Sequence, residues 1–119
     1  MNTHEKLNYV EFQAKDLLAT KAFFSKVFNW EFSDYGEDYT SFSGQGLDGG
    51  FFKSDNCSLS SNGGALLVFY SLDIKSTLEK VVNNGGTILR PIFDFPGGCR
   101  FHFMEPSGNE FAVWTDKNI

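Results

Sequence analysis

The fold is decided by the stretch Leu7–Phe32, LNYVEFQAKDLLATKAFFSKVFNWEF. Residues 7–14 alternate apolar and polar side chains, which is typical of a β-strand with one buried face. Asp16 is a residue type that caps helix N-termini, and apolar residues then recur at helical spacing from Leu17 to Phe28. The stretch therefore predicts a strand followed directly by a helix.

The same arrangement returns after a shift of 57 residues, which places Asp73 on Asp16. A second strand is predicted over Ala65–Leu72 (ALLVFYSL) before Asp73, a second helix is predicted after it, and Gly85-Gly86 ends that helix. Three short strands are predicted after each helix, around 30–35, 39–43 and 50–53 and then around 87–93, 99–104 and 109–114. The order β-α-β-β-β therefore occurs twice, which indicates an internal duplication.

Length and composition agree with one globular domain over residues 1–119, with modules at about 5–55 and 63–117. The 119 residues are 41% hydrophobic and 21% charged, so the chain has enough apolar side chains for a core. Strands and helices in this order predict an α+β protein whose helices cover curled sheets. Aromatic residues reach 17%, and 14 of them are Phe, which suits a large core, an aromatic pocket or a subunit interface.

Several partner classes are disfavoured. The net charge is −5 and no basic cluster occurs, which argues against nucleic acid and anionic membranes as partners. No apolar run approaches the roughly 20 residues of a membrane-spanning helix, and Met1–Lys6 lacks the apolar core of a signal peptide. Cys57 and Cys99 show neither a disulfide framework nor a metal spacing. We therefore expect a cytoplasmic protein with free thiols.

Three segments together resemble the vicinal oxygen chelate superfamily, which includes glyoxalase I, extradiol dioxygenases and bleomycin-resistance proteins. They are Leu7–Phe32, Leu47–Lys53 (LDGGFFK) and Gly97–Trp114 (GGCRFHFMEPSGNEFAVW). The first resembles the family's strand, Asp-Leu and helix, with Asn29 at the usual Gly. The last resembles the family's Asp-Pro-x-Gly-Asn hairpin, with Glu105 at the usual Asp. The resemblance implies two cups of curled sheet that hold the ligand, often across a dimer of short chains.

The resemblance also implies where the family's metal ligands would fall. Counted from the strand-end Asp of each half and from the hairpin Gly, these positions hold Tyr9, Leu66 and Ala112. Phenol is a rare metal ligand, and leucine and alanine offer no donor atom. We therefore expect the family metal site to be absent and no cofactor to be bound. A different divalent metal site, built from Glu11, Glu110 and His102, stays open as an alternative.

Glu11 shares a strand face with Tyr9, and two interpretations of it stay open. It is either exposed or salt-bridged at a strand edge, or it lies in an aromatic cup. Burial in a cup would raise the pKa of its carboxyl group and suit it to general-base work or to amine binding. The second interpretation predicts that Glu11→Gln abolishes ligand binding with little change in melting temperature.

The remaining candidates also have two interpretations each. Arg100 either binds a ligand carboxylate through both guanidinium nitrogens or pairs with Glu105 or Asp94 at the surface. His102 is either a proton shuttle or a packed histidine, and one of the two residues Phe51 and Phe52 enters the cup. Tyr70 and Trp114 line either the cup or the core. The candidate ligand-binding residues are Tyr9, Glu11, Phe51, Leu66, Tyr70, Arg100, His102, Ala112 and Trp114.

These observations favour a metal-free, homodimeric protein that binds a small molecule in an aromatic cup, similar to the bleomycin-resistance branch. The net charge, Glu11 and the aromatic faces favour a cationic ligand. The alternatives are a metal-dependent lyase, isomerase or dioxygenase, a metal-independent enzyme with Glu11 or His102 as base, and a protein-interaction module. The sequence leaves open whether the protein is an enzyme.

Overall fold

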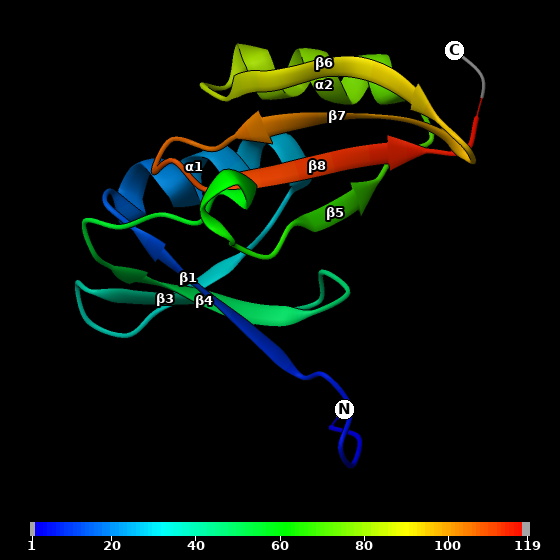
Figure 1. Ribbon diagram of the computed structural model, residues 1–119. Helices are drawn as coiled ribbons and strands as arrows, with labels where there is room; N and C mark the ends of the chain where they lie inside the picture. The colour runs from blue at the N-terminus through cyan, green and yellow to red at the C-terminus, as the bar shows by residue number, and fades with distance from the viewer. Residues whose placement is uncertain (1, 118–119) are drawn as a thin grey trace.

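The computed structural model describes residues 2–117, which form two four-stranded sheets and two α-helices (Figure 1). The first half contains β1 (Tyr9–Ala14), α1 (Leu17–Phe28), β2 (Phe32–Asp34), β3 (Tyr39–Phe42) and β4 (Asp48–Lys53). The second half contains β5 (Leu67–Tyr70), α2 (Ile74–Asn83), β6 (Thr87–Phe95), β7 (Gly98–Met104) and β8 (Glu110–Thr115). A short 3-10 helix, Ser60–Asn62, lies in the segment between the halves.

The two sheets repeat one topology. Their strand orders are β1-β4-β3-β2 and β5-β8-β7-β6. In each sheet the first strand pairs in parallel with the last strand of its half, and the other pairings are antiparallel. This confirms the predicted α+β fold with two β-α-β-β-β units. Within residues 2–117 neither helix is long and apolar enough to cross a membrane.

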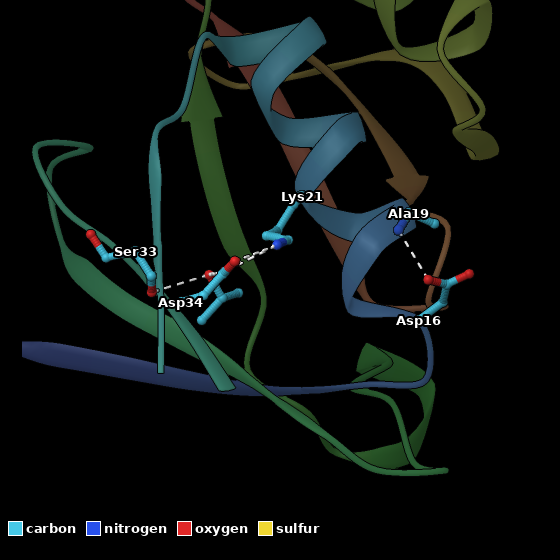
Figure 2. A network of polar contacts seen from close by, with 6 residues as sticks. Asp16, Ala19, Lys21, Ser33 and Asp34 are labelled. Carbon is cyan, nitrogen blue, oxygen red and sulfur yellow. Dashed lines mark hydrogen bonds and ion pairs between the residues drawn. The ribbon is translucent and has the colours of Figure 1, made fainter. Parts of the chain in front are cut away.

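The helix caps explain why each helix begins where the sequence predicts. The Asp16 carboxylate accepts a hydrogen bond from the Ala19 amide at 3.0 Å (Figure 2), and Asp73 caps α2 in the same way. Helix α1 ends at Phe28 and is capped by Asn29, whose φ of 62° lies in the left-handed region. Asparagine tolerates that region better than other residues with a side chain, so it replaces the family's usual glycine.

An ion pair joins α1 to the edge of the first sheet. Both Asp34 carboxylate oxygens on β2 accept hydrogen bonds from the Lys21 ammonium at 3.0 Å (Figure 2). These bonds, together with one from the Thr40 hydroxyl, hold the pKa of Asp34 below its ordinary value. The contact fixes the exposed edge of the first sheet against the helix.

The surplus of phenylalanine fills the space between the two halves. Phe24 of α1 is fully buried, and its ring centroid lies 4.5 Å from that of Trp30 and 5.3 Å from that of Phe111 on β8. Phe12 of β1 also packs against Phe111, at 5.0 Å. One aromatic core therefore joins the two sheets, and burial of such rings is a large part of what stabilises the fold.

A buried carboxylate forms a second connection between the halves. Glu105, in the hairpin before β8, is 1% exposed and accepts a hydrogen bond from the Thr20 hydroxyl of α1 at 2.6 Å. It also accepts bonds from the Ser107 and Asn109 amides and from the Asn109 side chain. Burial raises the pKa of Glu105, and these four bonds oppose the rise. The predicted hairpin is confirmed, and it fixes α1 against the second sheet.

Candidate functional site

The face of the second sheet that turns away from the aromatic core carries two neighbouring rows of side chains. Residues paired in register across a sheet point to the same face, so the strand pairings define both rows. The first row is Arg90, His102, Ala112 and Val68, and the second is Phe93, Arg100, Trp114 and Tyr70. We call these eight residues the arginine face.

The two arginines of the chain both lie on this face. Their guanidinium carbons lie 3.9 Å (Arg90) and 5.4 Å (Arg100) from the centre of the Phe93 ring. Neither arginine belongs to an ion pair within residues 2–117, and the buried Nε of Arg100 has no hydrogen-bond partner. A protein of net charge −5 thus keeps two cations without an acidic partner on one face. Such a pair suits an anionic ligand.

A buried histidine lies beside these arginines. His102 is 4% exposed, and its Nδ1 lies 2.8 Å from Oε2 of Glu110. The other Glu110 oxygen accepts hydrogen bonds from the amide and the hydroxyl of Ser60, each at 2.8 Å. Burial raises the pKa of Glu110, but the bonds from His102 and Ser60 outweigh it, so the pKa is lowered overall. Glu110 therefore orients the imidazole ring.

The second ring nitrogen of His102 is not used in these hydrogen bonds. Nε2 is buried and has no hydrogen-bond partner. A buried polar atom without a partner costs free energy, and such atoms are rare in native proteins unless a ligand or water meets them. Together with Nε of Arg100 on the same strand face, it marks a place where a polar group of a ligand would be favourable.

The structure brings five of the nine candidate residues together on the arginine face. They are Tyr70, Arg100, His102, Ala112 and Trp114. Leu66 directly precedes β5 and lies outside the two rows. The surface pairing of Arg100 with Glu105 or Asp94 is not formed within the described residues, because Glu105 is buried in its hairpin.

Tyr9 and Glu11 form a separate cluster on β1 of the first sheet. Both are exposed, and the Tyr39 hydroxyl donates a 2.9 Å hydrogen bond to the Glu11 carboxylate and also bonds the Tyr9 hydroxyl. Burial and then these two bonds raise the pKa of Tyr39 well above its ordinary value. Any side chain at Gly50 would collide with the Tyr39 hydroxyl, so Gly50 lets Tyr39 cross β4 and reach β1. We call Tyr9, Glu11 and Tyr39 the tyrosine cluster.

One expectation about the first sheet needs correction, and one of the two interpretations of Glu11 is favoured. Phe51 does not line a cup, because it is fully buried and packs against the rings of Phe12 and Phe24. Phe52 is the residue of that pair on the opposite face. Glu11 is exposed rather than enclosed by aromatic side chains, so in the single chain it takes the strand-edge environment.

The side chains do not fit the family's metal. The three implied positions carry a phenol (Tyr9), an isobutyl group (Leu66) and a methyl group (Ala112), which do not provide the three or four donors that a divalent ion needs. The alternative set of Glu11 with Glu110 and His102 is not assembled. Across residues 2–117, no three His, Cys, Asp or Glu side chains gather where they could hold an ion.

Three contributors to these sites, Arg90, Phe93 and Tyr39, were not predicted from the sequence. Arg90 lies on β6 directly across from His102, and Tyr39 bonds Glu11 across the sheet. The paired glycines 49–50 were the available signal for Tyr39, because a small residue in a strand often marks the close approach of another group.

Comparison with known proteins agrees with this fold. A family model described as "Glyoxalase/Bleomycin resistance protein/Dioxygenase superfamily" matches residues 6–113. The chain belongs to this superfamily. No curated protein matches the sequence closely enough to add to this assignment.

Solved structures with the same fold are distant in sequence. A glyoxalase/bleomycin resistance protein/dioxygenase family enzyme from Burkholderia phytofirmans PsJN has a TM-score of 0.79 at 15% identity, covering 94% of this chain and 99% of that one. A fosfomycin resistance protein from Listeria monocytogenes has a TM-score of 0.77 at 19% identity, covering 95% and 94%. A lactoylglutathione lyase from Agrobacterium tumefaciens has a TM-score of 0.69 at 18% identity, covering 96% of each chain. At these identities the similarity concerns the fold.

Proposed function

We propose that this superfamily member binds a small organic anion on the arginine face and does so without a metal. The observation that carries the proposal is the pair of arginines without acidic partners, together with the buried Nε–H donor of Arg100 that has no hydrogen-bond partner. A carboxylate has the planar shape and the lone pairs that a guanidinium group binds through two nitrogens. The aromatic side chains of the face supply apolar contacts around it, as in most small-molecule sites.

We propose an anionic ligand in place of the cationic ligand that the net charge of the sequence favours. Glu110 is already bonded to His102 and Ser60, and Glu11 is exposed and bonded to Tyr39. Neither carboxylate is therefore buried and free to attract an ammonium group. The local arrangement of charges on the arginine face decides the ligand, because net charge acts over the whole surface rather than at one site.

The proposal includes a homodimer, and a cytoplasmic location remains our expectation from the sequence. Short chains of this superfamily often form dimers in which the curled sheets of two chains face each other, and we expect the same of this chain of 119 residues. Native mass spectrometry is expected to show a species of twice 13.4 kDa. A monomer at micromolar concentration would contradict the dimer and leave the anion site unaffected.

A matched ligand series tests the class of ligand. We expect EDTA-treated protein to bind 4-phenylbutyrate about 10–100-fold more tightly than 4-phenylbutanol, because hydrogen bonds to charged groups contribute about 1.5–3 kcal/mol. The amine of the same skeleton, 4-phenylbutylamine, is expected to bind no better than the alcohol. Isothermal titration calorimetry measures all three. Tighter binding of the amine, lost in Glu11→Gln, would contradict the proposal and favour a cation site at the tyrosine cluster.

A second candidate is a metal-independent enzyme with His102 as general base. The Glu110 contact favours it, because a carboxylate on Nδ1 leaves Nε2 to take a proton from a bound molecule. An enzyme of this kind would exchange a carbon-bound hydrogen of its ligand with D2O. Proton NMR would show the exchange in the wild type and its loss in His102→Gln, with ligand binding retained.

A further inference from the structure

A groove of about 370 Å³ lies between the two sheets, at the edge strands β1 and β5. Four rings of the aromatic core form part of its lining: Phe12, Trp30, Phe42 and Phe111. No charged side chain lines the groove. Its volume is at the small end of the range for sites that hold drug-sized molecules, and its lining suits an uncharged, apolar group.

The groove is continuous with the arginine face. Val68 and Tyr70 line the groove and also end the two rows of the arginine face on β5. Arg100 lies on β7, and β8 is the strand between β7 and β5. Neighbouring strands are about 4.8 Å apart, so the path from Arg100 along the arginine face to β5 is about 10 Å. The groove begins there, at the β5 edge, because its rings belong to the core side of the sheet and Val68 and Tyr70 belong to the arginine face. One molecule of moderate length can reach both.

We infer that the ligand is an amphipathic monocarboxylate, with its carboxylate at Arg100 and Arg90 and its apolar chain in the groove. This inference rests on the proposed function and adds to it the apolar part of the ligand and the place where that part binds. Each end of such a ligand meets matching chemistry. Two arginines without acidic partners face its carboxylate, and a groove without charged side chains faces its apolar chain. A short anion would leave the groove empty, and a neutral hydrocarbon would leave the arginines unpaired.

A homologous series measures the contribution of the groove. Each methylene moved from water into an apolar site tightens binding by about fourfold. The carbons nearest the carboxylate cross the arginine face, so we expect only small gains in affinity from butyrate to octanoate. From octanoate through dodecanoate we expect affinity to rise by about fourfold per carbon, and then to level off when the groove is full. Arg100→Gln is expected to weaken binding of each acid by a similar factor, because it changes the head-group contact and leaves the groove intact.

A matched pair of variants places the chain in the groove. Leu47 lies on the groove wall and is half-buried, so Leu47→Asp adds a charge there at little risk to the core. Leu18 on α1 is 75% exposed and outside the groove lining, so Leu18→Asp is its control. Calorimetry measures, for the wild type and for both variants, how much the affinity rises per added carbon of the acid. Circular dichroism checks that each protein is folded.

We expect the rise in affinity per added carbon to be lost in Leu47→Asp and retained in Leu18→Asp. A flat series in the wild type, with binding still dependent on Arg100, would overturn this inference and leave the proposed function in place; a partner chain that fills the groove would give this result. A rise per added carbon that Leu47→Asp leaves unchanged would also overturn it, because the chain would then lie elsewhere. Absence of binding by any of the acids would overturn the proposed function itself.

Discussion

Replacing Glu105 with alanine is expected to lower the free energy of unfolding by about 2–4 kcal/mol, because a buried hydrogen-bonding group left without its partner costs about 1–3 kcal/mol and several are affected together. The carboxylate is 1% exposed and accepts four hydrogen bonds, one of them from Thr20 on α1 of the other half. Its removal leaves those donors buried without an acceptor and opens a cavity between the hairpin and the helix. Urea denaturation followed by circular dichroism measures the loss.

Glu37→Ala is the matched control, because Glu37 is exposed in the turn after β2. Substitutions at such positions change stability by less than about 0.5 kcal/mol. An equal effect of the two substitutions would show that the buried contact between α1 and the hairpin does not stabilise the fold as described.

The Glu105 contact also has an expected pH dependence. Burial raises the pKa of Glu105 in the folded state. A carboxyl group with a raised folded-state pKa contributes its full stability below its unfolded pKa and loses it as the pH rises through the folded value. The side-chain amide in Glu105→Gln does not titrate. The pH-dependent contributions of all other titratable groups are the same in both proteins and cancel when the two stabilities are compared. The stability advantage of the wild type over Glu105→Gln is therefore expected to be larger at about pH 4 than at about pH 7.

The double substitution Arg90→Gln/Arg100→Gln is expected to weaken binding of 4-phenylbutyrate by about 100-fold or more, because two charge-assisted contacts of about 1.5–3 kcal/mol each are removed. Arg100→Gln alone is expected to have the larger single effect, since Arg100 is half-buried and Arg90 is exposed. Both guanidinium groups lie over the ring of Phe93, so the two effects are not expected to add simply.

Lys26→Gln/Lys75→Gln removes the same two charges from exposed positions on the helices. If this control weakens binding as much as the arginine pair does, the ligand responds to the overall field of the protein rather than to the arginine face. Arg100→Lys separates charge from geometry, because lysine keeps the charge but cannot bind a carboxylate through two fixed donors. We expect it to recover part of the affinity and not all of it.

Much of the fold could be predicted because local chemistry specifies it. The capping Asp residues fix where α1 and α2 begin, and the alternation in β1 puts Phe12 in the core and Glu11 on the other face. The choice between Phe51 and Phe52 could not be made in this way. Alternation separates the two faces of a strand but does not say which face is inward when both are partly covered.

The site was predictable only in part. Arg100 and His102 are two residues apart on one strand, so their common face follows from alternation. Arg90 joins them through an irregular pairing, because the register of β6 against β7 shifts between Arg90 and Phe93. A bulge of this kind changes which face the following residues present. The contact of His102 with Glu110 likewise depends on the register of β7 against β8, which the sequence does not specify locally.

The most direct test of the central claim is a calorimetric titration of 4-phenylbutyrate into EDTA-treated protein, repeated after addition of Ni²⁺, Zn²⁺ or Fe²⁺. The arginine face offers cationic donors for the carboxylate, and the family's metal positions hold Tyr9, Leu66 and Ala112. We therefore expect saturable binding with one molecule per chain and the same dissociation constant with and without metal. Binding that appears only after a metal is added would contradict the account.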